Sequence, residues 1–206
     1  MKPSIVSLVL IGILSSCSNV KTNNPEEAKE SVSQVTAPAE QDIHAIAEQN
    51  ATDTLKGSLK AKAMGTIGDA GITINYYSPA VRGRVIWGGL VPFDNVWVTG
   101  AHRATNIEFN QEVIIGGINI APGMYALFTI PGKEEWTIII NRNWDQHLTD
   151  DYDPKKDIVR IKVKPETKSV NQERLRYLVE AESDTQGEVV IYWEKLKVSL
   201  PVTVFK

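Results

Sequence analysis

The sequence predicts an all-β domain, a β-sandwich or open barrel of about nine strands, preceded by a flexible tether. Three observations support this. From Leu59 onward the apolar residues recur with a period of two, which is typical of half-buried strands. Glycine and proline turns separate these short apolar runs, and the domain has no convincing amphipathic helix pattern. No long internal repeat is visible, so a propeller or solenoid is not expected.

The first strands follow from alternation and from turns. Residues 71–76 alternate and place Ile72, Ile74 and Tyr76 on one face. Residues 112–115 and 118–120 flank two glycines, which supply the positive φ angles of a tight hairpin turn. We therefore expect a strand followed by a hairpin in this half of the domain.

The later strands begin after an Ala-Pro-Gly turn at residues 121–123. Residues 124–130 and 135–141 are apolar on both faces, so we expect interior strands covered on each side. Further strands are expected over residues 157–164, 173–181, 187–193 and 197–205. Pro201 lacks an N–H group and predicts that the last strand is an edge or carries a bulge.

The composition excludes several classes of protein. Hydrophobic residues make up 42% and charged residues 23% of the 206 residues, as in ordinary globular proteins. The net charge of -3 gives no support for binding nucleic acid, which normally requires a strongly basic face. The single cysteine excludes an internal disulfide and a cysteine-based metal cluster.

Residues 1–16 predict a secretion signal. Lys2 gives a positive start, residues 5–14 are apolar, and two serines precede Cys17. The apolar run is too short to cross a bilayer as a helix. The sequence around Cys17 looks like the lipobox of bacterial lipoproteins, in which the cysteine is acylated and becomes the first residue of the mature chain. The alternative is a conventional cleaved signal with an incidental cysteine.

The resemblance to lipoproteins implies where the protein is held. Ser18 after the cysteine favours the outer membrane, and the absence of an acidic cluster favours the periplasmic side. Residues 17–56 are rich in small and polar residues and predict a flexible tether, since they cannot bury enough apolar surface to fold. The folded domain is expected over residues 57–206. Its predicted partners are membrane lipid through acylated Cys17 and a small molecule, glycan or protein.

One polar cluster is the first candidate binding site. It lies in a glycine-rich stretch predicted to be loop, where binding residues often gather. Arginines beside a histidine and an aromatic residue suit a carboxylate, a phosphate or a sugar. The alternative is structural: the arginines pair with Asp94 and nearby carbonyls while Trp87 and Trp97 fill the core. The candidate binding residues are Arg82, Arg84, Trp97, Thr99, His102 and Arg103.

Catalysis has only weak candidates, His102 as a general base and Asp94 as its carboxylate partner. The sequence has no nucleophile elbow, no zinc-protease helix motif and no phosphate-binding glycine loop. Residues 142–154 form a second long connection, in which Trp144 beside His147 could stack on a sugar ring. We expect no metal site and no cofactor.

Several ordered motifs give a family resemblance. They are SPAVRGRVIWGGLVP (residues 78–92), WVTGAHRAT (97–105), APGMY (121–125), PGKEEWTII (131–139), DIVR (157–160) and WEK (193–195). The chain resembles DUF2911, a family of exported proteins of Bacteroidetes and related bacteria whose function is unknown. The resemblance covers about residues 60–204.

The chain departs from the family pattern after Trp97. The pattern continues Arg-Thr-Gly-Ala-Asn-Glu-Ala-Thr, whereas this chain has Val98 in place of the arginine and His102-Arg103 in place of Asn-Glu. If the family uses that polar trio, the chemistry of this chain is altered or lost. The sequence therefore predicts a lipid-anchored envelope protein that binds a ligand or a protein. The first alternative is an envelope hydrolase of glycans or peptides, and the second is a structural envelope component with no small-molecule ligand.

Overall fold

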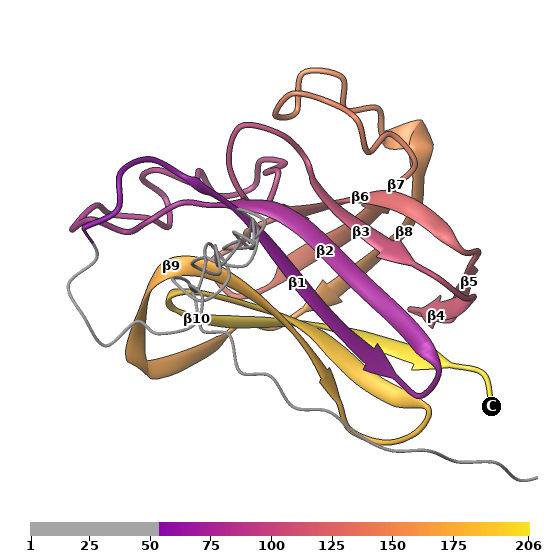
Figure 1. Cartoon of the computed structure of the whole chain (residues 1–206). Coiled ribbons are helices and arrows are strands. Elements are labelled where there is room, and N and C mark those ends of the chain that lie inside the picture. Colours follow the sequence, from indigo (N-terminus) through magenta and orange to yellow (C-terminus); the bar gives the residue numbers. More distant parts are fainter. Residues whose placement is uncertain (1–53) are drawn as a thin grey trace, which may run out of the picture. The chain divides into compact units, whose positions relative to one another are not determined.

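The computed structural model describes residues 54–206 and contains ten strands and one short 3₁₀ helix (Figure 1). The signal peptide predicted over residues 1–16, Cys17 and nearly all of the tether lie outside the described residues. The described residues contain no helix that is long and apolar enough to cross a membrane. The elements are β1 (Leu59–Ile67), β2 (Ala70–Ser78), β3 (Thr105–Phe109), β4 (Val113–Ile115), β5 (Ile118–Ile120), β6 (Gly123–Ile130), β7 (Trp136–Asn141), η1 (Pro154–Lys156), β8 (Asp157–Val163), β9 (Glu166–Ala181) and β10 (Gln186–Val204).

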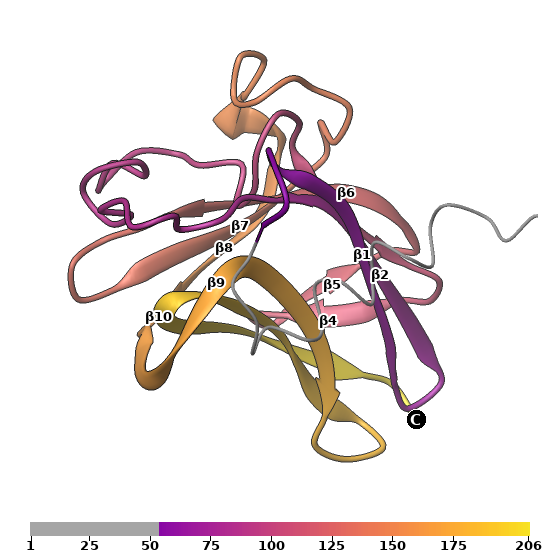
Figure 2. The ribbon, with the colours of Figure 1, turned by 60° about the vertical axis from the view of Figure 1, so that its left-hand side comes forward.

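The strands form two antiparallel sheets (Figures 1 and 2). One sheet has six strands in the order β1-β2-β3-β6-β7-β8, and the other has four in the order β5-β4-β10-β9. The predicted fold class is confirmed: the domain is all-β, and its sheets remain separate instead of closing into one barrel.

The core between the sheets is built by alternation along the strands. In β2, Ile72, Ile74 and Tyr76 are buried on one face, as predicted. Interior strands β6 and β7 are covered on both faces, which is also confirmed. Leu127 belongs to the main core, and Phe128 belongs to a second cluster on the other side of the sheet.

Three strand predictions need correction. β1 and β3 were not predicted, although Ile107 and Phe109 of β3 alternate with polar residues and are buried. The two strands expected near the C-terminus are one continuous strand, β10, with register shifts on either side of Glu194. Pro201 lies inside β10, after its pairing with β9 ends at Lys197 and before its pairing with β4 begins at Thr203. A missing N–H is tolerated there because no ladder pair is formed at that position.

The edges of the two sheets meet where β1 passes β9. A Cβ atom at Gly65 of β1 would lie 2.6 Å from Val179 Cβ and 3.3 Å from Val179 O. No such approach is possible between ordinary side chains, so this crossing requires a glycine on β1. The contact brings the edge of the six-stranded sheet against the edge of the four-stranded sheet.

We predict that Gly65→Ala lowers the free energy of unfolding by about 1–3 kcal/mol, because the added methyl group overpacks the crossing. Urea denaturation followed by fluorescence measures this change. Val179→Gly provides the control: it removes the Cβ and Cγ1 atoms that the added methyl would meet at 2.6 and 3.1 Å, so the cost of Gly65→Ala should shrink in that background. Equal costs in both backgrounds would contradict the steric explanation.

Two buried tyrosines, Tyr76 of β2 and Tyr177 of β9, meet in the core between the two sheets. The rings of Tyr76 and Tyr177 meet edge to face with centroids 4.7 Å apart. Burial raises the pKa of Tyr76 to about 12 and raises the pKa of Tyr177 well above its ordinary value. Both phenols are therefore held in their neutral form by the fold.

We predict that the protein loses stability as the pH rises above about 10. The folded pKa of Tyr76 is higher than its unfolded pKa of 10.0, so the stabilisation is complete below pH 10 and is lost as the pH approaches about 12. Tyr76→Phe should reduce this pH dependence by up to about 1.4 kcal/mol per pH unit. Urea denaturation of both proteins at several pH values from about 9 to about 11 measures the two slopes. Identical slopes would show that Tyr76 is not a source of the effect.

Candidate functional site

The segment between β2 and β3, residues 79–104, begins as a short extension of the four-stranded sheet. Ala80 bridges Arg174 of β9, and Val81 N donates to Glu173 O at 2.8 Å. Arg174 is fully buried, and its guanidinium donates to the carbonyls of Leu55, Gly57 and Ser78 at 2.8, 3.1 and 3.0 Å. This arginine therefore joins the start of the domain, the end of β2 and β9.

A cluster of four tryptophans forms the core beneath this segment. Trp136 comes from β7, Trp193 from β10, and Trp87 and Trp97 from residues 79–104. The Trp87 ring lies edge to face with Trp136 at 4.9 Å and with Trp193 at 5.7 Å, and Trp97 stacks on Trp193 at 5.6 Å. These separations are those of favourable aromatic pairs. The cluster thus fixes the segment to both sheets.

Residues 98–104 then leave the six-stranded sheet and return to it. Trp97 pairs with Thr129 of β6 through two backbone hydrogen bonds of 2.8 and 3.0 Å, and Thr105 pairs with Leu127 of the same strand. Residues 98–104 lie between these two points, and we call them the His102 loop. Its apex residues, His102 and Arg103, are exposed.

Thr99 holds the base of the His102 loop. It is fully buried, and its hydroxyl lies 3.0 Å from the Thr129 hydroxyl. Its carbonyl accepts hydrogen bonds from the Tyr177 and Thr105 hydroxyls at 2.7 and 3.1 Å. Thr99 has a φ of 52°, a region that β-branched residues rarely adopt. Such backbone strain persists only where the surroundings impose it, and it is most common at functional sites.

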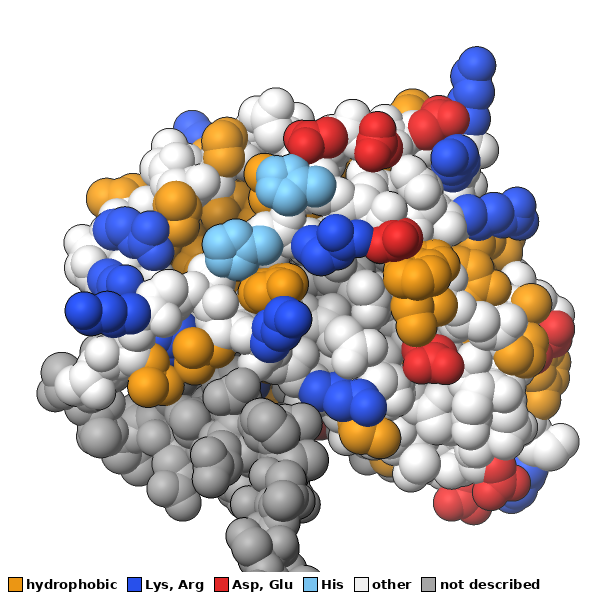
Figure 3. All heavy atoms as spheres, turned by 45° about the horizontal axis from the view of Figure 1, so that its top comes forward, with side chains coloured by type: hydrophobic (Ala, Val, Ile, Leu, Met, Phe, Trp, Pro, Cys, Tyr) orange, Lys and Arg blue, Asp and Glu red, His pale blue; other side chains and the backbone are white. Residues whose placement is uncertain are grey.

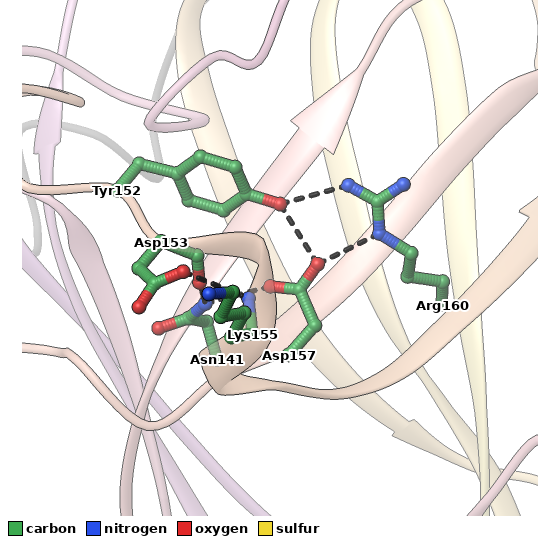
Figure 4. A network of polar contacts seen from close by, with 6 residues as sticks. All are labelled: Asn141, Tyr152, Asp153, Lys155, Asp157 and Arg160. Carbon is green, nitrogen blue, oxygen red and sulfur yellow. Dashed lines mark hydrogen bonds and ion pairs between the residues drawn. The ribbon is translucent and has the colours of Figure 1, made fainter.

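A second loop, residues 142–153, follows β7, and we call it the His147 loop. A polar network fixes its two ends (Figure 4). Buried Asn141 donates to Asp157 Oδ1 at 2.6 Å and to Asp153 O at 3.0 Å. Asp157 Oδ2 accepts from Tyr152 at 2.8 Å and from Arg160 at 2.7 Å. Partial burial raises the pKa of the Tyr152 phenol, which keeps it protonated as a donor.

We predict that Asp157→Ala loosens the His147 loop, because it removes the acceptor shared by Asn141, Tyr152 and Arg160. Loss of these bonds should lower the free energy of unfolding by about 2–4 kcal/mol. Hydrogen exchange should accelerate across residues 142–153 more than in β2 or β6. Asp151→Ala is the matched control, since Asp151 is exposed and only its backbone oxygen is hydrogen-bonded. Equal protection of the loop in both variants would contradict the role of Asp157.

The two loops are joined to each other. Leu148 N donates to His102 O at 3.0 Å, and Ala104 N donates to Gln146 O at 3.1 Å. Arg103 and His147 also form an isolated antiparallel β-bridge through their backbones. Because backbone bonds connect them, the loops form one continuous surface. Figure 3 shows both described histidines on one face, among acidic and basic side chains.

The side chains on this joint surface form polar pairs. Arg103 forms an ion pair with Asp145, and His147 Nδ1 lies 2.9 Å from Asp150 Oδ2. The Arg103, Asp145, His147 and Asp150 side chains are 50%, 65%, 63% and 63% exposed. The His102 ring packs edge to face on Tyr77 at 5.0 Å. Trp144, also in the His147 loop, is 39% exposed. The surface therefore offers donors, acceptors and aromatic rings to a molecule in solvent.

The remaining predicted site residues lie elsewhere. Arg82 donates to Leu55 O and Arg84 to Val81 O, so their hydrogen bonds go to carbonyls, as one alternative held. Asp94 N donates to Pro131 O at 2.8 Å, which places Asp94 at the turn after β6. Trp97 and Thr99 face the interior. Within residues 54–206, no hydrogen bond or ion pair joins Asp94 to His102, Arg82 or Arg84.

The joint surface includes residues that the sequence did not identify. Asp145 and Asp150 are partners of Arg103 and His147, and Tyr77 supports His102. The sequence indicates Trp144 and His147 as a sugar-binding pair, but the connection of their loop to His102 depends on contacts that are distant in sequence. Among the described residues, no group of three or more His, Cys, Asp or Glu side chains is placed to hold a metal ion.

The fold and this surface define a two-sheet β-sandwich with a candidate binding face made from two joined loops. The chain belongs to the DUF2911 family, described as a protein of unknown function, whose model matches residues 58–202. The predicted resemblance is thus confirmed over nearly the whole described domain. No curated protein and no solved structure matches the chain.

Proposed function

We propose that this chain is a lipid-anchored protein of the cell envelope that binds a glycan on the joint surface of the His102 and His147 loops. The anchor is acylated Cys17, held in the outer membrane and facing the periplasm. The lipobox-like sequence supports the anchor. Loss of fatty-acid labelling in Cys17→Ser would test it separately from ligand binding.

The observation that carries the glycan proposal is the pairing of opposite charges on an exposed, rigid surface. Sugar hydroxyls both donate and accept hydrogen bonds, so they need both kinds of group. Arg103 donates, while Asp145 and Asp150 accept. The two loops together carry four aspartates and two arginines, and this excess of negative charge disfavours a phosphate or carboxylate ligand, because like charges repel. Among the ligands predicted from sequence, the sugar therefore fits this surface best.

Trp144 adds an apolar ring to the polar surface. It is 39% exposed, although most tryptophan side chains are largely buried. An indole face can cover the apolar face of a sugar ring while the charged pairs bind its hydroxyls. Trp144 N donates to Arg142 O at 3.2 Å, and Gln146 Nε2 donates to Asn143 O at 2.6 Å, so the turn that carries Trp144 is fixed from within.

A second candidate function is an envelope hydrolase, and one contact favours it. His147 and Asp150 form the histidine–carboxylate pair that orients a general base in many hydrolases. His102, the centre predicted from sequence, packs instead on Tyr77. An enzyme of this kind would therefore use His147.

We predict that the unacylated chain (Cys17→Ser) binds soluble glycan fragments of the envelope, namely peptidoglycan fragments and outer-membrane oligosaccharides. Trp144→Ala and Asp145→Ala should each weaken binding about tenfold, which corresponds to about 1.4 kcal/mol. Calorimetric titration measures the affinities. Lys168→Ala, in a surface ion pair of comparable exposure on β9, is the control and should bind as the parent does. Absence of binding to every fragment would contradict the glycan proposal.

The same titration mixtures decide between the two functions. A hydrolase would convert the fragments, and His147→Ala would abolish the conversion while the fragments still bind. Mass spectrometry of the mixtures detects cleavage. Binding without turnover supports the binding module, and turnover unaffected by His147→Ala would contradict the role of the His147–Asp150 pair.

A further inference from the structure

The first part of the segment 79–104 carries a second surface, separate from the two loops. Val85 is 74% exposed and Leu90 is 45% exposed, and Leu90 N donates to Val85 O at 3.0 Å. Leu55, the second described residue, is 39% exposed. Its carbonyl accepts a hydrogen bond from the guanidinium of Arg82. We call Leu55, Arg82, Arg84, Val85 and Leu90 the entry patch.

The entry patch is rigid. Ile86 and Val91 are each 2% exposed and alternate with the outward-facing Val85 and Leu90. Gly88 N donates to Val91 O at 2.9 Å, and Trp87 is part of the tryptophan cluster. Val85 and Leu90 are therefore held outward by a packed turn.

Basic side chains accompany these apolar ones. Arg82, Arg84 and Lys56 are exposed, and each arginine keeps guanidinium N–H groups beyond those that bind carbonyls. One acidic side chain borders the patch, since Glu173 Oε1 accepts a hydrogen bond from Arg82 N at 2.7 Å. Apolar side chains flanked by an excess of positive charge suit the headgroup region of an anionic bilayer.

We propose that the entry patch docks on the bilayer surface that holds the anchor, with Val85 and Leu90 among the headgroups and Arg82 and Arg84 on lipid phosphates. This inference rests on the acylation of Cys17 in the proposed function. Along the sequence, Cys17 precedes the described domain, whose second residue, Leu55, is part of the patch. A patch with so few large apolar side chains is small for a stable protein–protein interface, which needs about 800 Å² on each partner. A tethered domain meets the membrane at high effective concentration, so a weak patch suffices.

The single cysteine of the sequence makes a direct test possible. In the acylated protein Cys17 carries lipid, so Leu90→Cys introduces one free thiol for a nitroxide label. Ile118→Cys is the matched control, because Ile118 is 46% exposed and lies on β5, at the other end of the domain in Figures 1 and 2. Both labelled proteins are reconstituted in vesicles of phosphatidylethanolamine and phosphatidylglycerol. The readout is accessibility of the label to a water-soluble nickel complex.

We predict that the label at position 90 is at least about fivefold less accessible to nickel than the label at position 118. Arg82→Gln with Arg84→Gln should raise the accessibility at position 90, since each basic residue near an anionic surface contributes about a fivefold change in binding. Vesicles of phosphatidylcholine alone should have the same effect. Equal accessibility at both positions would overturn the proposal.

Two further outcomes are distinguishable. If the label at position 90 is shielded from nickel in native membranes but not in vesicles that contain no other protein, the patch binds a protein and the membrane proposal is wrong. If Cys17 itself takes up the label, the protein is not acylated, and the anchor in the proposed function fails instead. Glycan binding by the two loops is measured without any membrane, so neither result decides it.

Discussion

The tryptophan cluster is the interaction on which the rest of this structure depends. A sandwich of two sheets leaves its ends uncovered, and the core at an uncovered end meets water. Here Trp136 and Trp193 come from different sheets, and Trp87 and Trp97 come from the segment that covers them. Each ring removes a large apolar area from water, and the edge-to-face and stacked contacts add to this. One cluster thus joins both sheets and fixes a long irregular segment without a helix or a disulfide.

The covering segment, residues 79–104, contains strained backbone and a buried polar atom unpaired among the described residues, and both cost folding free energy. Four residues other than glycine adopt positive φ within it, namely Arg82, Asp94, Thr99 and His102. Trp87 Nε1 is also buried without a hydrogen-bond partner among residues 54–206, as is Gln146 Oε1 in the His147 loop. Each such feature costs about 1–3 kcal/mol. Burial of the tryptophans and the bonds to Thr99 offset these costs, and the strained residues lie next to both proposed binding surfaces.

Most of the fold could be predicted from the sequence, because alternation is a local property. The interior positions of β6 and β7 follow from runs that are apolar on both faces. β10 was divided in two because the bulge at Glu194 interrupts the alternation, and Glu194 itself has a positive φ. Glycine pairs identified the hairpin of β4 and β5, but nothing local shows that Gly65 must pass Val179.

The candidate site was less predictable, because its pairs depend on distant contacts. His102 and Arg103 could be selected as polar residues in a loop. Asp145 is 42 residues from Arg103, and their pairing depends on the backbone bonds between the two loops. Conversely, Arg84 and Asp94 are close in sequence, but no hydrogen bond or ion pair joins them within residues 54–206. The turns between them carry Trp87 into the core, and Asp94 is held at the turn after β6.

The two proposed surfaces share one segment, and this has a consequence for function. The segment supplies residues 82–90 to the entry patch and residues 98–104 to the glycan surface, and its Trp87 and Trp97 pack in the same cluster. A segment fixed at both tryptophans cannot move one surface without the other. If the entry patch rests on the bilayer, the orientation of the glycan surface relative to the membrane is therefore set by the packing of the tryptophans. The tether would then determine where the domain can reach, and the cluster would determine which way its binding face points.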